Sequence, residues 1–136
     1  MKLLIVGSRS ITDFDLSPYV PAEVDTIISG GAEGIDGLAE RYADLHRLSK
    51  YILRPQYNLY GRAAPWKRNE QMVMMADAVP VIWDGCSKGA QYTLKYARKL
   101  NKPVTLVSDR VFRGDPYFEK YPSGYSPDEV IFILRM

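Results

Sequence analysis

The sequence has 136 residues, but only one cysteine, Cys86, and one histidine, His46. A single cysteine cannot form an internal disulfide, so a reducing compartment is the simpler expectation. The scarcity of both residue types excludes a zinc site that needs several cysteine or histidine ligands. We expect Cys86 to be a small buried residue and His46 to lie on the surface of a helix.

Long hydrophobic runs are also lacking at the N-terminus. The apolar run there covers residues 3–6 and ends at Gly7-Ser8-Arg9. A signal-peptide core needs about 7–15 apolar residues and a membrane-spanning helix about 20. We therefore expect a cytoplasmic protein that does not interact with membranes.

The chain lacks an excess of charge of one sign. It has 18 Lys and Arg against 16 Asp and Glu, a formal net charge of +2. Charge alone therefore gives no argument for binding nucleic acid, which would need a clustered basic patch. The proportions of 46% hydrophobic and 25% charged residues are typical of a globular protein, and the length corresponds to one domain.

Short apolar runs alternate with segments of helical period along the chain. The runs that we predict as strands are residues 3–6, 26–29, 51–53, 79–83 and 104–107. The segments that we predict as helices are residues 34–48, 66–76 and 88–100. Apolar strands joined by crossover helices favour a parallel sheet covered on both faces, so the sequence predicts a doubly wound α/β fold.

The same periodicity predicts which helix side chains face the core. In residues 34–48 the expected buried stripe is Ile35, Leu38, Ala39, Tyr42 and Leu45. In residues 66–76 it is Met72, Val73, Met75 and Ala76. In residues 88–100 we expect three residues inside, Ala90, Leu94 and Ala97, and three outside, Lys95, Arg98 and Lys99.

Three predicted strand ends carry glycine and small polar residues directly before a helix or turn. They are residues 7–9, 29–34 and 84–89. In open α/β sheets ligands bind beyond the carboxyl ends of the strands, where glycine admits a close approach and a helix N-terminus attracts anions. One such turn is more often only tight geometry, but three on one edge favour a phosphate or carboxylate ligand, with Arg9 and Lys88 adding charge-assisted bonds.

Neither of the two familiar phosphate-binding motifs is present in these turns. The segment from Gly85 to Lys88 lacks the G-K-[ST] ending of a P-loop, and Gly30-Gly31-Ala32-Glu33-Gly34 is not a G-x-G-x-x-G pattern. The motifs therefore give no support for dinucleotide oxidoreductase chemistry.

The segment from Ser29 to Glu40, SGGAEGIDGLAE, resembles the SGGAxGxDxLAE element of the SLOG superfamily. That group includes the DNA-processing protein A family and the LOG ("lysine decarboxylase-like") phosphoribohydrolases. Further matching segments are residues 6–9, 67–72, 76–77 and 83–90. They follow the family's order over about residues 3–108, and the chain is most similar to the small single-domain bacterial and phage branch.

The resemblance implies a three-layer Rossmann-like sheet of about five strands in the order 3-2-1-4-5. It also implies a ligand derived from a nucleotide, such as a nucleoside phosphate or an ADP-ribose-like molecule, with no metal and no other cofactor. The residues expected to bind this ligand are Gly7, Ser8, Arg9, Ser29, Gly30, Gly31, Ala32, Gly34, Asp36, Arg68, Asn69, Asp84, Gly85, Ser87, Lys88, Gly89 and Ala90.

The chain departs from the phosphoribohydrolases at the residue that acts on the ribose. Their signature is P-G-G-x-G-T-x-x-E, and aligning its G-T with Gly89-Ala90 places Thr93 at the glutamate position, whereas Arg68 retains the accompanying arginine. A hydroxyl cannot supply a carboxylate, so we expect nucleotide binding rather than hydrolysis by that mechanism. One alternative is a nucleotide or nucleoside N-glycosidase that uses Asp84 or Asp36 instead. The other is a single-stranded DNA-binding module like the DNA-processing branch.

Several candidate residues also have a plain structural interpretation. Arg68 and Asn69 bind an anion or form a solvated first helical turn, although the helix dipole disfavours arginine there. Asp36 hydrogen-bonds a ligand hydroxyl or simply stabilises the start of its helix. Asp84 is a base, a ribose contact or a turn former.

Aromatic and methionine residues leave base stacking and self-association open. Trp66 and Tyr60 stack on a base or belong to the core or an interface. We expect a homodimer, because Met72, Met74 and Met75 give one helix more apolar surface than a single stripe needs. The tyrosines expected at an oligomer contact are Tyr117, Tyr121 and Tyr125.

The end of the chain is predicted in less detail. We expect residues 1–108 to form the SLOG-like nucleotide-binding domain and residues 109–136 to form a C-terminal extension packed on it. Within this extension, residues 109–125 are rich in glycine, proline and tyrosine, which is typical of a long loop. Residues 130–134 fit a sixth strand, an edge hairpin or a dimer contact.

Overall fold

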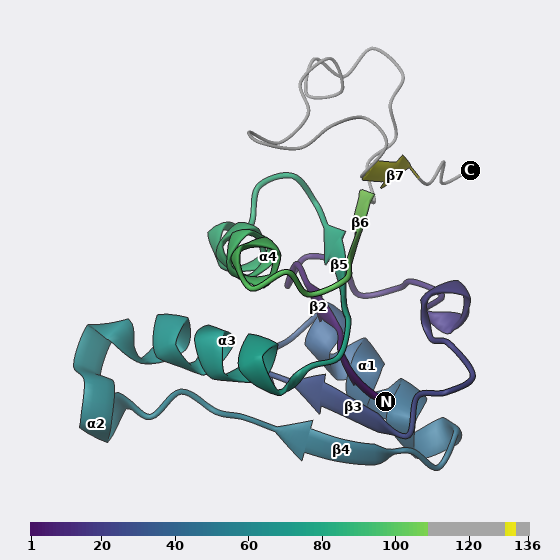
Figure 1. Cartoon of the computed structure of the whole chain (residues 1–136), viewed down its shortest axis with the longest axis horizontal. Coiled ribbons are helices and arrows are strands. Elements are labelled where there is room, and N and C mark those ends of the chain that lie inside the picture. Colours follow the sequence, from purple (N-terminus) through teal and green to yellow (C-terminus); the bar gives the residue numbers. More distant parts are fainter. Residues whose placement is uncertain (109–129, 133–136) are drawn as a thin grey trace.

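The computed structural model describes residues 1–108 and 130–132 (Figure 1). The strands are β1 (Lys2–Leu4), β2 (Val6–Gly7), β3 (Thr26–Ser29), β4 (Ser49–Ile52), β5 (Val79–Trp83), β6 (Val104–Ser108) and β7 (Val130–Phe132). The α-helices are α1 (Ile35–Leu45), α2 (Tyr57–Tyr60), α3 (Ala64–Met75) and α4 (Lys88–Lys99). Two 3₁₀ turns, η1 (Ser17–Tyr19) and η2 (Gly61–Ala63), complete the described elements.

The strands form two sheets in which every pair is parallel. One sheet has the order β1-β3-β4 and the other β2-β5-β6-β7. The two sheets meet at the N-terminal segment, where only Ile5 separates β1 from β2 and Leu3 forms an isolated parallel bridge with Ala78. The protein is therefore a mixed α/β structure built on parallel strands.

The apolar residues of the N-terminal segment contribute alternately to two hydrophobic clusters. Leu3 and Ile5 belong to one cluster, together with Ile35 and other residues of α1. Leu4 and Val6 belong to the other, which contains residues of α3 and α4. Successive strand residues point to opposite faces, so the four consecutive apolar residues can join both clusters. Accordingly, α1 packs against β2 and β3, whereas α3 and α4 pack against each other (Figure 1).

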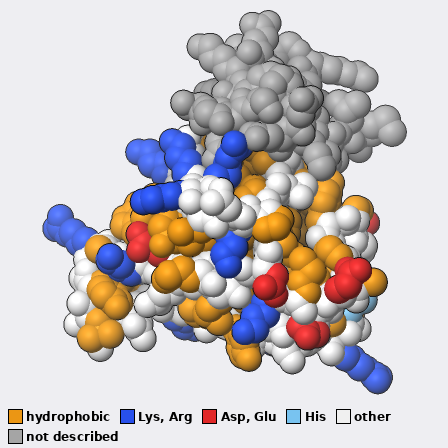
Figure 2. Space-filling model, in the orientation of Figure 1, with side chains coloured by type: hydrophobic (Ala, Val, Ile, Leu, Met, Phe, Trp, Pro, Cys, Tyr) orange, Lys and Arg blue, Asp and Glu red, His pale blue; other side chains and the backbone are white. Residues whose placement is uncertain are grey.

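Most predicted elements occur where the sequence indicated, and β3 and β5 match their predicted bounds. The expected inner face of α4 is confirmed, since Ala90, Leu94 and Ala97 are buried. Lys95, Arg98 and Lys99 are exposed as expected. On the face shown in Figure 2, Lys and Arg side chains gather over α4.

The predicted stripe of α1 is wrong at its C-terminal end. Leu45 is 81% exposed, while Ala43 is fully buried. Leu45 is the last helical residue before the cap at His46, and the chain turns there toward β4. His46 is exposed, as predicted, and its ring stacks on Tyr42 with the centroids 3.9 Å apart.

Two boundaries also differ from the prediction. The first strand is split at Ile5 into β1 and β2, because its two halves pair with different neighbours, β3 and β5. The third strand begins at Ser49 rather than 51, and all four of its residues are exposed, because β4 has a neighbour on one side only. The short α2 and η2 before α3 carry no periodic pattern long enough to predict them.

The described part of the C-terminal segment is β7, which pairs in parallel with β6. This agrees with an additional C-terminal strand and contradicts an edge hairpin, in which neighbouring strands would be antiparallel. The predicted loop at 109–125, its three tyrosines and Leu134 lie outside the described residues. In the part of the chain that is described, no helix has the length and apolar character needed to span a bilayer.

The methionines of α3 differ in burial. Met72 is buried and Met75 packs partly against the core, whereas Met74 is 54% exposed. Of the three methionines that suggested a dimer, only Met74 is therefore largely exposed. A homodimer stays a prediction.

Candidate functional site

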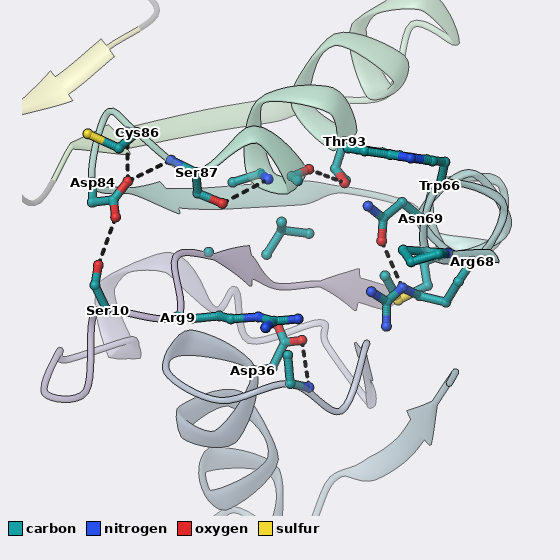
Figure 3. A pocket seen from close by; sticks show the side chains of 17 residues that line it. Arg9, Ser10, Asp36, Trp66, Arg68, Asn69, Asp84, Cys86, Ser87 and Thr93 are labelled. Atoms are coloured by element: carbon teal, nitrogen blue, oxygen red, sulfur yellow. Dashed lines mark hydrogen bonds between the residues drawn. The ribbon is translucent and has the colours of Figure 1, made fainter. Parts of the chain in front are cut away.

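A cavity of about 490 Å³ lies beyond the C-terminal ends of β2 and β5 (Figure 3). We call it the main cavity. Its walls come from the loops after β2, β3 and β5 and from residues of α1, α3 and α4. The predicted binding residues that line it are Gly7, Arg9, Ala32, Asp36, Arg68, Asn69, Asp84, Ser87, Gly89 and Ala90. The structure thus brings together residues from all three predicted strand-end turns and from the Arg68 segment.

The other predicted residues lie around this cavity rather than on its surface. Gly30 and Gly31 line a smaller cavity of about 150 Å³, which shares four lining residues with the main one. Among the described residues, five predicted ones line neither of these two cavities: Ser8, Ser29, Gly34, Gly85 and Lys88.

Ser8 connects the ends of the two strands below the main cavity. Its side chain is fully buried, and its Oγ accepts a hydrogen bond of 2.9 Å from the backbone N–H of Asp84. Its carbonyl oxygen accepts the N–H of Ile11 at 3.3 Å. The buried hydroxyl therefore positions the two loops, and Ser8 lines neither cavity.

Two glycines are explained by close contacts inside the protein. A Cβ on Gly7 would overlap the side chain of Ile35. Gly34 has a φ of +70°, and a Cβ there would lie 2.5 Å from the carbonyl oxygens of Ser8 and Arg9. Glycine is therefore required at these two positions by the packing of the protein itself, because a larger residue does not fit.

Ser29 and Gly30 order the loop after β3. The Oγ of Ser29 donates to Glu40 at 2.9 Å and accepts from the N–H of Gly31 at 3.1 Å. The carbonyl oxygen of Gly30 accepts a bond of 2.7 Å from Nη1 of Arg68. This loop thus anchors an arginine that comes from α3, 38 residues away in sequence.

Arg68 lies between the two cavities and lines both. Besides Gly30, its guanidinium donates through Nε to Oδ1 of Asn69 at 2.8 Å. No carboxylate of the described residues lies within ion-pair distance of it. Burial lowers the pKa of Arg68 and the charge of Asp36 opposes this shift, but an arginine remains protonated in a protein. The site therefore holds a half-buried positive charge.

Arg9 is exposed on the loop after β2 and also lines both cavities. Within residues 1–108, no side chain or carbonyl forms a hydrogen bond or ion pair with its guanidinium. Figure 3 shows the Arg9 side chain extended beside Asp36 on the floor of the main cavity. The five N–H donors of this group are therefore available to a ligand.

Asp36 stands in the first turn of α1, as predicted, where a negative charge is favoured. Its Oδ2 accepts a hydrogen bond of 3.1 Å from the N–H of Ala32. Burial raises the pKa of Asp36 above its usual value, although the bond from Ala32 and the charge of Arg68 act in the opposite direction. The carboxylate thus lines the main cavity while it also braces the loop after β3.

Asp84 closes the turn after β5. Its Oδ1 accepts the N–H groups of Cys86 and Ser87 at 2.7 and 2.9 Å, and its Oδ2 accepts the hydroxyl of Ser10 at 2.7 Å. Burial raises the pKa of Asp84, but the bonds from Cys86, Ser10 and Ser87 together outweigh burial and hold the pKa below its usual value. The geometry is that of a turn former whose carboxylate stays ionised.

The N-terminus of α4 opens toward the main cavity beside this turn. Ser87 caps the helix by accepting the N–H of Ala90 at 3.3 Å. In the described structure, the N–H groups of Lys88 and Gly89 have no hydrogen-bond acceptor, and Gly89 lines the cavity. Unpaired N–H groups in the first turn of a helix favour a negative charge nearby.

Thr93 is the residue that the sequence resemblance predicts in place of the phosphoribohydrolase glutamate. It lines the main cavity but is 1% exposed, and its Oγ1 donates to the carbonyl oxygen of Gly89 at 3.0 Å. Such a bond one turn back is a common way to satisfy a hydroxyl inside a helix. Thr93 therefore forms part of the cavity wall and does not supply an acidic group there.

Of the two candidate stacking residues, only Trp66 lines the main cavity. It is 39% exposed and packs edge-to-face on Tyr92 at 4.9 Å. Tyr60 is equally exposed but lines neither of the two cavities. The expectation that Cys86 is buried is wrong, because the β5 turn lifts it to the exposed rim of the cavity.

The sequence prediction missed several residues that line the cavities. They are Val6, Ser10, Pro65, Met72, Arg54, Pro55 and Tyr57. The last three follow β4, and the strand-end argument could have found them had it been applied to this strand as well. Within the described residues, no group of three His, Cys, Asp or Glu side chains is arranged to hold a metal ion.

Comparisons with known proteins give no relative for this chain. No family model matches it, and searches of curated proteins and of solved structures return no significant similarity.

Proposed function

We propose that this chain binds a nucleotide or a nucleotide derivative in the main cavity. The phosphate would lie between Arg9, Arg68 and the first turn of α4. The resemblance of residues 29–40 to the SLOG element supports the same ligand class. The two sheets meet at the N-terminal segment, and we propose that they act as one Rossmann-like sheet in which β4-β3-β1/β2-β5-β6 takes the order 3-2-1-4-5, with β7 added at the edge.

The observation that carries the proposal is the pair of arginines. Arg9 and Arg68 come from different elements, line one cavity, and have no carboxylate of the described residues within ion-pair distance. Two neighbouring cations repel each other, and the charge of Asp36, which lies beyond ion-pair distance, acts on both. An anion placed between the two guanidinium groups would reduce this repulsion further. Phosphate suits the site because it can accept several arginine N–H groups in a bidentate manner.

The remaining walls fit the other parts of a nucleotide. Trp66 offers an aromatic surface on which a base can stack. Asp36 offers a carboxylate oxygen that can accept a ribose hydroxyl. The volume of the main cavity, about 490 Å³, is within the usual range of small-molecule sites.

Asp36 also favours a second candidate function, an N-glycosidase. It is a carboxylate of raised pKa that lines the main cavity beside two arginines, which is the setting in which catalytic acids are often found. Asp84 is less suited to this role because its two oxygens already accept three hydrogen bonds. Free base released from AMP by the wild type, and lost in Asp36→Asn, would identify this activity.

The test of binding is a titration of nucleoside 5′-monophosphates into the wild type and into Arg9→Gln. We expect Arg9→Gln to weaken binding about tenfold or more, the effect of one charge-assisted hydrogen bond. It should not change the melting temperature of the free protein, because Arg9 makes no described side-chain bond. Arg41→Gln, an exposed arginine of α1 outside both cavities, is the matched control. Absence of binding by the wild type across the four common bases would overturn the proposal.

A further inference from the structure

We infer that the ligand carries a second phosphate group, which the smaller cavity binds with Arg54. This inference rests on the proposed function, because it concerns the same ligand. We call the smaller cavity, of about 150 Å³, the arginine cavity. Its described lining is Arg9, Gly30, Gly31, Ala32, Arg54, Pro55, Tyr57, Pro65 and Arg68.

The arginine cavity has an unusual balance of charge. Three guanidinium groups line it, those of Arg9, Arg54 and Arg68, and its described lining includes no aspartate or glutamate. The main cavity, in contrast, has Asp36 and Asp84 beside Arg9 and Arg68. Compared with the main cavity, the arginine cavity contributes one further positive charge, that of Arg54, and no negative charge. The two cavities together therefore favour a ligand with more negative charge than one phosphate carries.

Arg54 is exposed, and its guanidinium contacts the loop after β3. Its Nη1 donates to the carbonyl oxygen of Gly31 at 3.4 Å, and a Cβ on Gly31 would lie only 2.8 Å from the same nitrogen. Gly31 has a φ of +74°, which favours glycine independently of the contact. The guanidinium thus rests on a glycine backbone, and its other N–H groups have no partner within the described residues.

The two cavities adjoin, so one ligand can reach both. They share Arg9, Ala32, Pro65 and Arg68. Arg68 stands on this boundary, held by the carbonyl oxygen of Gly30 at 2.7 Å. A phosphate in the main cavity and a second one in the arginine cavity would therefore both contact the same guanidinium.

Tyr57 supplies a further donor on the outer wall. It is 61% exposed and lines the arginine cavity. A phenol hydroxyl can donate a hydrogen bond to a phosphate oxygen. Every polar side chain that lines the arginine cavity can therefore donate a hydrogen bond to a phosphate.

The inference predicts a difference between nucleotides with one and with two phosphates. We would titrate the 5′-monophosphates and 5′-diphosphates of adenosine, guanosine, cytidine and uridine, together with adenosine 3′,5′-bisphosphate, and measure binding calorimetrically. The wild type should bind a two-phosphate nucleotide about tenfold more tightly than the monophosphate of the same base, which corresponds to one additional charge-assisted contact. The diphosphate and bisphosphate arms distinguish a phosphate chain from a second phosphate on the ribose.

Arg54→Gln should abolish this tenfold difference and leave monophosphate affinity within about twofold of the wild type. Arg54→Lys keeps the charge but loses the planar fork, so it should retain part of the difference. Arg62→Gln is the matched control, since Arg62 is an exposed arginine of η2 that lines neither cavity. Melting curves without ligand would verify that each variant folds.

The outcomes separate this inference from the proposed function. If monophosphates bind and the second phosphate adds nothing, or if Arg54→Gln leaves its gain intact, the inference is overturned and nucleotide binding stands. If no nucleotide with one or two phosphates binds the wild type, both fail. A gain that disappears in Arg54→Gln, is reduced in Arg54→Lys and is unchanged in Arg62→Gln supports the inference.

Discussion

Two walls of the adjoining main and arginine cavities differ in how their polar groups are satisfied. In the β5 turn, residues 84–87, both carboxylate oxygens of Asp84 accept hydrogen bonds from Ser10, Cys86 and Ser87. In the arginine wall, formed by Arg9, Arg54 and Arg68, most N–H donors have no acceptor in the described structure. The side chains of Arg9 and Arg54 form no ion pair among the described residues.

This difference separates residues that build the site from residues that are ready to bind. A carboxylate whose oxygens are occupied stabilises the fold, and a ligand would have to displace its partners to use it. A guanidinium with unused donors contributes little to folding and can bind an anion without losing anything. Substitutions in the β5 turn should therefore change stability, and substitutions in the arginine wall should change affinity.

The largest expected effect comes from Gly34→Ala, because Gly34 supports the backbone of the arginine wall. Its φ is +70°, and a Cβ would lie 2.5 Å from the carbonyl oxygens of Ser8 and Arg9. We expect a loss of about 3 kcal/mol of unfolding free energy, measured by urea denaturation, from backbone strain and steric overlap together. Gly89→Ala is the control, since apart from the neighbouring residues and the backbone of its own helix no atom lies within 4 Å of an added Cβ there. Equal stabilities of the two variants would contradict this account of Gly34.

The next effect is that of Arg68→Gln on ligand affinity. Arg68 lines both cavities, so the variant should lose about 30-fold in nucleotide affinity, the equivalent of about 2 kcal/mol. Its bonds to Gly30 and Asn69 should make the stability loss no larger than about 1 kcal/mol. Titration calorimetry and urea denaturation of the same preparations measure the two quantities. A loss of stability with affinity unchanged would place Arg68 among the residues that build the site.

How far the sequence could predict this arrangement depends on the range of the interactions involved. Periodicity located β3, β5 and α4 because burial repeats at a local spacing. It placed the strand-end turns at one edge because parallel strands end together. It failed at Leu45, where the helix ends and no neighbour covers the side chain, although the spacing fits the stripe.

The division of the site into two walls could not be predicted. Arg68 and Asp84 were both binding candidates, and their sequence neighbours do not reveal which has its hydrogen bonds satisfied. Asp84 is satisfied partly by Ser10, which is 74 residues away, and Arg68 is anchored by Gly30. The wrong expectation for Cys86 has the same cause. Its exposure depends on the hydrogen bonds of the β5 turn, which the sequence alone does not reveal.

The third prediction concerns Asp84→Asn and its dependence on pH. The folded protein holds the pKa of Asp84 below the unfolded value of about 3.9, so the ionised carboxylate stabilises the fold above that pH. This contribution is lost as the pH falls through the folded pKa. We expect Asp84→Asn to cost about 1 kcal/mol at pH 7, a modest value because the group is partly exposed. The difference from the wild type should shrink toward pH 3 in urea denaturation, and a difference that grows on acidification would reverse the assigned role.

The smallest and most discriminating effect is that of Asp36→Asn, because its two readouts should change in opposite directions. Burial raises the pKa of Asp36 in the folded state, so the ionised form opposes folding at neutral pH and protonation relieves this. The asparagine oxygen can still accept the N–H of Ala32, which is bonded to the carboxylate at 3.1 Å. We therefore expect Asp36→Asn to be more stable than the wild type by less than about 1 kcal/mol at pH 7.

The stability gap should narrow as the pH falls through the raised folded pKa and close below the unfolded value of about 3.9, where the wild-type carboxylate is protonated in both states. Nucleotide affinity should decrease severalfold in the variant, because a neutral amide accepts a ribose hydroxyl more weakly than a carboxylate. Urea denaturation across pH and titration of a nucleotide measure the two effects. Higher stability with lower affinity would mean that the ionised Asp36 serves the ligand and destabilises the fold. A loss of stability at pH 7 would instead mean that Asp36, like Asp84, mainly stabilises the fold.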